Sequence, residues 1–207
     1  TCLGALKKAK ACGPDGLPAE VYKASPKAKR LLFDLIKRVW REEDVDVPEE
    51  LAEGIFVMLY KNKGSPSDFR KYRAICLLNH AFKVLSAYLL LRLLKSVEDF
   101  LPPEQAGFRK RRGTRDNIFV LARLIERAAA AQEVTVLTLV DFTAAFDTVS
   151  HRFLDVALEE AGADEKCRAV FRAIYGAASA RVRVVTPDGV RYSEAFEVRR
   201  GVVQGDI

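Results

Sequence analysis

A run of aliphatic and β-branched residues at 134–140 ends in Asp141, and Phe146 follows five residues later. The run has the length of a strand and contains no charged residue, which predicts a buried β-strand. Such a strand presents the residue at its C-terminal end on the rim of a sheet, where ligand-binding groups commonly lie. A carboxylate there can hold a magnesium ion. The alternative is that Asp141 only ends a strand and begins a turn.

Basic residues are concentrated in two places along the chain. With 207 residues, 49% of them hydrophobic and 30% charged, the composition is that of a globular protein, and the net charge of +6 indicates nucleic-acid binding only if the cations cluster. Each cluster can follow a phosphate backbone, and the alternative is a solvated basic loop. The first comprises Lys61, Lys63, Arg70, Lys71 and Arg73, and the second comprises Arg109, Lys110, Arg111, Arg112 and Arg115.

Several classes of protein are disfavoured. Cys2, Cys12, Cys76 and Cys167 have no paired short spacing, so neither a zinc knuckle nor a disulfide framework is indicated, and Cys76 is expected to be a small core residue. No signal peptide is present, and the most apolar predicted helix, near 81–94, is too short and too charged to span a membrane. We therefore expect an intracellular protein. The chain lacks an initial Met and stops directly after Gln204-Gly205-Asp206-Ile207, so truncation at both ends is the expectation.

The local patterns predict alternating helices and hairpins in one continuous module. Turn and strand signals come from Gly/Pro/Asp-containing stretches between apolar runs, and helix signals come from apolar residues at helical spacing. Ser150 is predicted to cap a helix that closes near Gly162. The expected elements are a turn at 13–16, helices to about 40, a hairpin of 54–60 and 72–78 with a basic loop, helices from 79 and over 116–131, a further helix to about 178, and a hairpin of 181–186 and 190–198.

Four blocks, taken with their order and spacing, resemble the reverse transcriptases of non-LTR (LINE-type) retrotransposons. The blocks are residues 61–73, 105–109 (Gln-Ala-Gly-Phe-Arg), 140–147 (Val-Asp-Phe-Thr-Ala-Ala-Phe-Asp) and 200–206 (Arg-Gly-Val-Val-Gln-Gly-Asp). The turn at 13–16 resembles the N-terminal element of that family too. The related enzymes of group II introns come next in similarity.

The resemblance implies an α+β right-hand polymerase fold consisting of fingers and a partial palm, truncated before the aromatic-x-Asp-Asp hairpin. On this basis residues 1–207 form a single reverse transcriptase domain fragment. Residues 1–78 would be fingers, 79–150 the start of the palm with the first catalytic Asp, and 151–207 a return through the fingers to the Gln-Gly-Asp block. The sequence contains no Asp-Asp pair, so the fragment by itself is expected to be inactive.

The resemblance also implies roles for individual residues. Asp141 would be the first catalytic aspartate and would hold two Mg²⁺ ions, with the backbone carbonyl of Phe142 completing one coordination sphere. Phe146 would exclude a ribose 2′-hydroxyl, for which the alternative is a core phenylalanine. Asp147 is interpreted as a turn or capping residue, and His151 as a structural residue.

Further residues would bind the nucleotide and the template by the same resemblance. Lys61 or Lys63, together with Arg73, would grip the triphosphate of a dNTP, although Tyr60 and Ala74 replace the usual prolines beside the first lysine and the arginine. Gln204 and Gly205 would close the nucleotide pocket. The residues expected along the template path are Gln105, Arg109, Lys110, Arg111 and Arg112.

The implied partners are an RNA template, a DNA primer and dNTPs, without a membrane and with the oligomeric state open. Three alternatives remain. The chain can be a degenerate nucleic-acid-binding relic that has lost catalysis, or a group II intron maturase-type enzyme. It can also be an unrelated α/β nucleotide-binding module, against which the lack of a Gly-rich phosphate loop counts.

Overall fold

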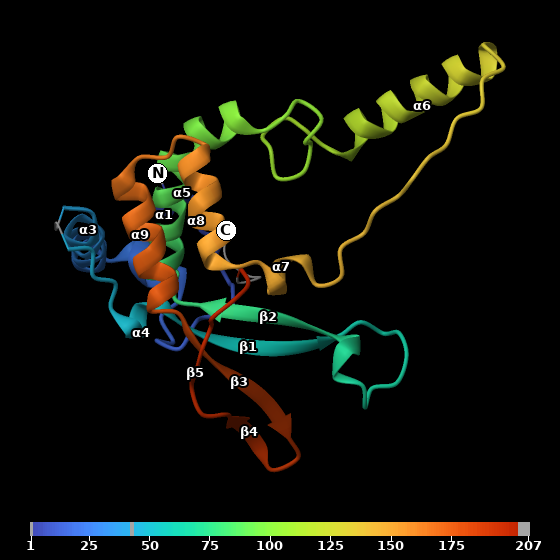
Figure 1. The fold of residues 1–207 in the computed structure, drawn as a ribbon. Coiled ribbons are helices and arrows are strands. Elements are labelled where there is room, and N and C mark those ends of the chain that lie inside the picture. Colours follow the sequence, from blue (N-terminus) through green and yellow to red (C-terminus); the bar gives the residue numbers. More distant parts are fainter. Residues whose placement is uncertain (1, 42–43, 203–207) are drawn as a thin grey trace.

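A computed structural model of the chain describes residues 2–41 and 44–202. Groups of helices alternate with groups of strands along it, and both a helical layer and a sheet are present (Figure 1). The elements are α1 (Cys2–Ala5), α2 (Ala19–Ala24), α3 (Pro26–Arg41), α4 (Glu49–Ala52), β1 (Glu53–Tyr60), the 3₁₀ helix η1 (Phe69–Lys71), β2 (Tyr72–Leu78), α5 (His80–Phe100), α6 (Thr114–Ala130), α7 (Ala145–Thr148), α8 (His151–Glu160), α9 (Glu165–Gly176), β3 (Ser179–Thr186), β4 (Gly189–Tyr192) and β5 (Phe196–Glu197).

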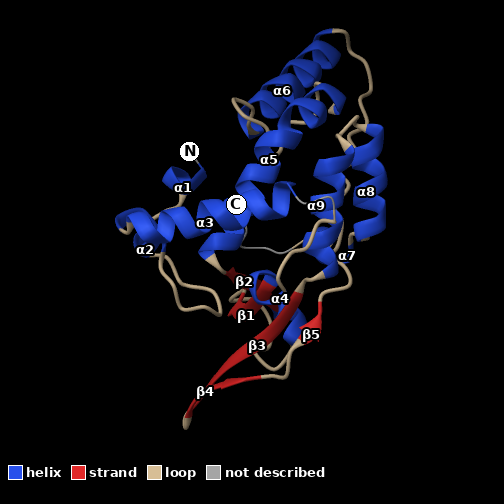
Figure 2. Cartoon of the chain, turned by 90° about the vertical axis from the view of Figure 1, so that its left-hand side faces the viewer, coloured by secondary structure: helices blue, strands red, loops and turns tan. Residues whose placement is uncertain are grey.

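The sheet is mixed. Within the described residues its order is β2-β1-β3-β4, with β5 also paired to β3. The hairpin predicted over 54–60 and 72–78 is confirmed, because β1 and β2 pair antiparallel from Gly54↔Leu78 to Tyr60↔Tyr72. No sequence pattern indicated the parallel pairing of β1 with β3, which joins Glu53 to Ser179. Figure 2 shows the longer helices gathered on one side of this sheet.

The second predicted hairpin is only partly correct. Strand β3 pairs with β4 around the turn at 187–188, but the expected strand at 190–198 is divided into β4 and β5. At Val182 the backbone N–H donates to the Ser193 Oγ at 2.9 Å, while the Ser193 N–H donates to the Val182 carbonyl at 3.0 Å. A side-chain oxygen thus replaces the backbone acceptor, and the ladder is interrupted there.

Helix α5 is the centre of the core. Phe82, Leu85, Leu89 and Leu93 are buried on one face, as their spacing predicted, and the helix ends just before Pro102. Helix α9 packs against α5 through Cys167, Val170 and Ile174, and Cys76 of β2 joins the same cluster with 1% of its surface exposed. Burial raises the pKa of the Cys167 thiol to about 11, so this thiol stays protonated at neutral pH.

Helix α8 lies on the outside of α9 and is held there by charge. Ser150 caps α8 as predicted, with its Oγ accepting from the Phe153 N–H, and Gly162 ends it with a φ of +74°. Asp155 accepts from Arg168 at 3.1 Å and from Arg172 at 3.2 Å. These guanidinium groups, Arg168 first, hold the pKa of the Asp155 carboxyl below its usual range.

The N-terminal turn is fastened to the junction of β2 and α5. The Gly16 N–H donates to the Gly13 carbonyl at 3.1 Å, as the turn signal predicted. The buried Asn79 side chain accepts from the Asp15 N–H at 3.1 Å and donates to the Glu50 carbonyl at 2.8 Å. His80 Nδ1 lies 3.0 Å from the Leu17 carbonyl and donates to it. This turn therefore fixes the start of the central helix.

We expect Gly13→Ala to lower the free energy of unfolding by about 1–3 kcal/mol, because overpacking displaces buried backbone. A Cβ at Gly13 would lie 2.4 Å from the backbone nitrogen of Asn79, whereas a Cβ at Gly176 would meet nothing within 4 Å. Gly176→Ala is therefore the matched control, and urea unfolding of both variants is the measurement. Equal stability of the two variants would contradict this account of the turn.

Helix α6 projects away from the rest of the molecule, and a long extended segment returns from it to α7 (Figure 1). The helix lies close to its predicted range. Ile118, Phe119 and Leu124 on it are more than half exposed. Among the described residues, no helix combines the length and apolarity needed to cross a bilayer. The mixed α/β architecture agrees with the predicted fold class, while its division into fingers and part of a palm stays a prediction.

Candidate functional site

The strand predicted at 134–140 is wrong for this structure. The segment is extended, but it pairs with no neighbouring strand among the described residues. Val134, Val136 and Leu139 are 95%, 85% and 85% exposed. A strand needs a partner for its backbone N–H and C=O groups, and β1 to β5 all pair elsewhere. Asp141 therefore lies in an exposed extended segment and not on the rim of the sheet.

The Asp141 side chain is accessible. It is exposed and makes no hydrogen bond or ion pair with another described residue, and Phe142 beside it is 76% exposed. A carboxylate and a backbone carbonyl are the hard oxygen ligands that Mg²⁺ prefers. No group of three or more potential ligands occurs within the part of the chain that the structure describes. Asp141 and Phe142 thus fit as part of a magnesium site and do not complete one.

Phe146 is placed by a tight turn. Ala144, the N-cap residue of the single turn α7, has a φ of +51°, and the Thr148 hydroxyl donates to its carbonyl at 3.1 Å. The Phe146 side chain is 42% exposed, so it is not a core residue of the described protein. Its ring meets the Phe108 ring edge to face, with centroids 5.8 Å apart. Asp147 is exposed in the first turn of α7, as expected for a turn residue.

The C-terminal described residues dock against this turn. The Val202 N–H donates to the Phe146 carbonyl and the Gly201 N–H to the Val149 carbonyl, both at 2.8 Å. Gly201 has a φ of +85°, and a Cβ there would lie 2.8 Å from the Asp147 carbonyl oxygen. Only glycine fits this approach. The structure thus brings the fourth sequence block to the third. Gln204 and Gly205 lie outside the described residues.

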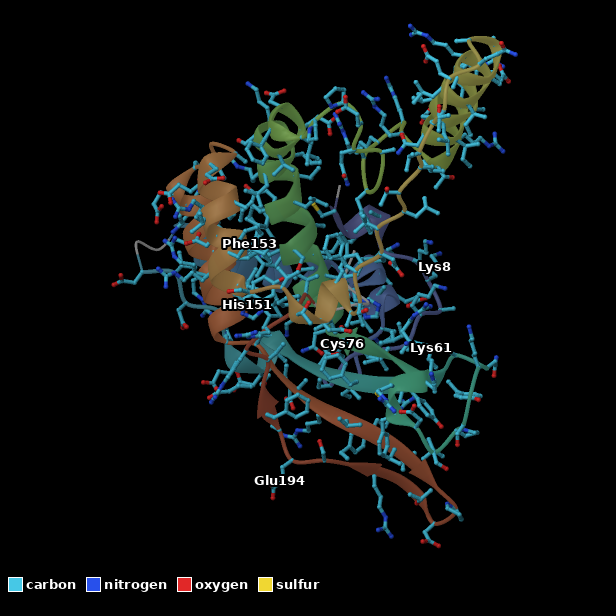
Figure 3. The ribbon with its side chains drawn as sticks, turned by 45° about the vertical axis from the view of Figure 1, so that its right-hand side comes forward. Lys8, Lys61, Cys76, His151, Phe153 and Glu194 are labelled. Atoms are coloured by element: carbon cyan, nitrogen blue, oxygen red, sulfur yellow. The ribbon has the colours of Figure 1, made fainter. Side chains whose placement is uncertain are left out.

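His151 is a structural residue, as predicted. Its Nε2 donates to the Gly201 carbonyl at 2.8 Å, and its ring lies against Tyr175 with centroids 4.3 Å apart. Figure 3 shows His151 at the start of α8, directly after α7. The imidazole therefore ties the C-terminal segment to the helical layer, and its Nε2 proton is committed to that carbonyl.

The first basic cluster lies at the free end of the β1–β2 hairpin, where Figure 3 places Lys61. Lys61, Lys63 and Arg73 are exposed. The Lys61 N–H donates to the Lys71 carbonyl at 2.8 Å, and Arg73 pairs with Leu59. Because side chains alternate along a hairpin, Lys61 and Arg73 leave the same face of it. The basic tip belongs to the β1–β2 hairpin, whereas the Phe146 turn belongs to the short helix α7.

Two tyrosines brace the basic tip. The Tyr60 hydroxyl donates to the Gly64 carbonyl, and the Tyr72 hydroxyl donates to the Pro66 carbonyl at 2.9 Å. The Tyr60 and Tyr72 rings contact each other across the hairpin with centroids 5.4 Å apart. Tyr60 occupies one of the positions where the resembling family usually has proline. Its hydroxyl ties the loop by a hydrogen bond where a proline would restrict the backbone directly.

The second basic cluster lies in the loop between α5 and α6, except for Arg115 in the first turn of α6, and its members differ in their surroundings. The Arg109 side chain is only 8% exposed: it forms an ion pair with Glu98 at 2.6 Å and donates to the Pro102 carbonyl at 2.8 Å. Lys110 and Arg111 are exposed and make no ion pair with a described residue, and Arg112 donates to the Pro103 carbonyl. Gln105 is exposed and donates to the Gly107 carbonyl at 3.3 Å. Arg109 shapes this loop, whereas Lys110 and Arg111 face solvent.

We expect the loop to loosen in acid. The hydrogen bonds from Arg109 hold the pKa of the Glu98 carboxyl below its ordinary value of 4.5. This interaction is therefore fully present above pH 4.5 and is lost as the pH falls through the lowered pKa of the folded state. Pepsin cleavage within 102–113, expressed at each pH relative to cleavage of a free peptide of the same sequence, should rise from pH 5 to pH 2. Glu98→Gln should be cleaved readily already at pH 5, and equal resistance of both proteins would contradict this role.

Sequence reasoning missed several contacts that build the site. Phe108 lies inside the recognised block at 105–109, yet its contact with Phe146 has no local signature. The same holds for Glu98, which lies 11 residues before its partner Arg109. Gly201 could have been found, because an isolated Gly next to a β-branched, strand-like run suggests a bulge or a close approach of backbone.

The sequence that forms this site is similar to those of known proteins. The family model described as reverse transcriptase (RNA-dependent DNA polymerase) matches residues 60–207. The chain is 28% identical over 208 residues to the RNA-directed DNA polymerase from mobile element jockey of Drosophila funebris, covering 98% of this chain and 22% of that protein. It is 30% identical over 106 residues to the protein of the same name from Drosophila melanogaster, covering 50% of this chain and 12% of that protein. The chain thus spans less than a quarter of the length of either relative, and the resemblance inferred from the sequence blocks is confirmed.

Proposed function

We propose, since this chain belongs to the reverse transcriptase (RNA-dependent DNA polymerase) family, that it forms the nucleotide-gripping part of an RNA-directed DNA polymerase. The enzyme containing it would extend a DNA primer on an RNA template with dNTPs. The observation that supports this most is the docking of Gly201 and Val202 against the Phe146 turn. It joins two sequence blocks that lie about 50 residues apart, as a single nucleotide pocket requires.

The proposal assigns parts of the fold to parts of a right hand. Residues 1–78 correspond to fingers, 79–150 to the beginning of the palm, and 151–207 to the return towards the nucleotide pocket. The contact of β1 with both β2 and β3 supports placing residues from the first and last of these parts in one sheet. A hairpin with a basic, exposed tip is a suitable structure for the fingers.

Asp141 and the Phe142 carbonyl are the proposed magnesium ligands of this chain. Divalent ions, when bound, stabilise the charge that develops on the entering and leaving oxygens during nucleotidyl transfer. Asp141 is suited to this because it is exposed and engaged with no other described side chain. The proposal takes two Mg²⁺ ions for the whole enzyme, with further ligands from outside the described residues.

The triphosphate and sugar of the dNTP would be held from two sides. Arg73, with Lys61 or Lys63, presents a bidentate guanidinium and a mobile ammonium from the hairpin, which suits phosphate oxygens. Phe146, half exposed and set by a tight turn, offers a ring face that can meet the 2′ position of the sugar. Gln204 and Gly205, which lie outside the described residues, are proposed to close the nucleotide pocket.

RNA-templated primer extension tests the proposed function. We expect the polymerase containing this chain to incorporate dNTPs on an RNA template in the presence of Mg²⁺. Binding of primer-template without any extension would instead indicate the nucleic-acid-binding relic. A polymerase that shows no binding and no extension would refute the proposal.

The basic loops make a separate prediction about salt. The logarithm of the affinity for primer-template should fall linearly with the logarithm of the salt concentration, because phosphate contacts release counterions. Replacing Lys110 and Arg111 together by Ala should reduce that slope by about 2, one for each phosphate contact. Arg191→Ala, whose side chain is 71% exposed on β4, is the matched control and should leave the slope unchanged. A slope that the double variant leaves unchanged would remove these residues from the interface.

A further inference from the structure

Phe108 is an almost fully exposed aromatic residue in a basic loop. The residue is 94% exposed, and its backbone has a φ of +61°, which a bulky residue rarely adopts. A large apolar ring held in water by an unfavourable backbone conformation is not explained by packing of the described protein. Backbone outliers of this kind concentrate where a ligand is bound.

The loop around Phe108 is rigidly built. Arg109, the next residue, points inward: its guanidinium contacts Glu98 of α5 and the carbonyls of Pro102 and Gln105. These contacts fix the backbone on the C-terminal side of Phe108. The Phe108 ring is therefore held outward before a ligand binds. Binding then costs little conformational entropy, which is preorganisation.

Several cations lie beside the ring. Lys110 and Arg111 are exposed, and a shallow hollow of about 490 Å³ lies between this loop and the end of α5. Lys95, Phe108 and Arg111 line it, together with two carboxylates, Asp99 and the Glu98 that pairs with Arg109. Proteins bind single-stranded nucleic acid with exposed aromatic rings placed next to cations. The cations contact the phosphate backbone, and the rings stack on the bases, since every base has a π-face. The composition of this hollow suits an unpaired nucleotide, with the base on the ring and the phosphate beside the cations.

We propose that Phe108 is a stacking platform for an unpaired base of the template strand, with Arg109 as the positioning residue that holds the platform. The inference rests on the proposed function and names the contact by which this loop holds nucleic acid. The Phe108 ring touches Phe146 edge to face. A base stacked on Phe108 would consequently lie next to the proposed nucleotide pocket.

The test is binding of the full chain to single-stranded RNA that carries 2-aminopurine, whose fluorescence is quenched by stacking on an aromatic ring. Phe108→Ala should weaken binding roughly 5- to 150-fold, the range found for removal of one stacking ring. The slope of affinity against salt should not change, because no charge is removed. Phe108→Trp should retain both affinity and quenching. Phe153→Ala is the matched control, since Phe153 is 67% exposed on the outer helix α8 (Figure 3).

The outcomes separate this inference from the proposed function. If the unchanged protein binds RNA with the expected salt dependence while Phe108→Ala binds as tightly as Phe153→Ala, the stacking platform is refuted and the proposed function stands. If the unchanged protein binds no RNA, both fall together. Arg109→Lys provides the second readout: it keeps the charge but cannot make the three contacts, so the quenching should diminish while the salt slope is retained. Unaltered quenching in Arg109→Lys would overturn the positioning role.

Discussion

Asp141→Asn should abolish primer extension by the polymerase that contains this chain while leaving primer-template binding largely intact. The substitution keeps the size of the side chain and removes the charge that is proposed to attract Mg²⁺. A loss of about 4–5.5 kcal/mol of transition-state stabilisation, or roughly 10³- to 10⁴-fold in rate, is the scale expected for metal-dependent charge stabilisation. Binding should persist because Asp141 contacts no phosphate in this account. Single-turnover extension and equilibrium binding are the paired measurements.

Asp147→Asn is the matched control for that experiment. Asp147 is exposed like Asp141 and lies six residues further along the same segment, so the chemical change is identical. In the structure its backbone carbonyl, and not its carboxylate, supports the approach of Gly201. Extension should therefore continue in Asp147→Asn. Normal extension by Asp141→Asn, or equal losses in the two variants, would contradict the assignment of the catalytic aspartate.

Replacing Phe146 by Ala should allow ribonucleotides to be incorporated. Removal of the ring leaves room for the 2′-hydroxyl, and discrimination against ribonucleotides should fall roughly 10- to 200-fold, the range for a difference of one small group in a pocket. Stability should change little, because the ring is 42% exposed. The ratio of kcat/KM for dNTP and rNTP is the measurement, and Phe146→Tyr, which keeps the ring, should discriminate normally. If Phe146→Ala discriminates as well as the unchanged protein, Phe146 has no role in sugar selection and only packs against Phe108.

Local order was predictable from the sequence wherever neighbouring residues decide it. The β1–β2 hairpin follows from two apolar runs around a polar loop, and α5 follows from leucines at helical spacing before two prolines. The cap at Ser150 depends on one hydroxyl and the next turn of chain, so it too could be predicted. In each case the partners lie within a few residues or across one hairpin.

Long-range contacts could not be predicted in the same way. The parallel pairing of β1 with β3 joins residues more than 120 positions apart, and no local pattern encodes it. The strand expected at 134–140 failed for a related reason. Its apolar, β-branched composition is that of a strand, but whether a partner strand lies beside it is a property of the whole fold.

The candidate site was likewise predictable only where local sequence decides it. Which residue types would bind metal, sugar and phosphate could be named from the sequence blocks. The contacts that support these residues could not be predicted. They are the ion pair of Arg109 with Glu98, the hydrogen bond from Tyr60 to the loop and the close approach at Gly201, and each depends on groups brought together by folding. These supporting contacts give otherwise exposed loops a defined shape.

Metal-directed cleavage of the polypeptide tests the central claim most directly, namely that Asp141 holds the divalent ion beside the Phe146 turn. Fe²⁺ substituted for Mg²⁺ in the polymerase, together with ascorbate and peroxide, cuts the backbone near the bound ion. We expect cleavage close to residues 141–142 that excess Mg²⁺ suppresses and that Asp141→Asn removes while Asp147→Asn retains it. Cleavage confined to other parts of the chain, with the same fragments from Asp141→Asn, would contradict the account.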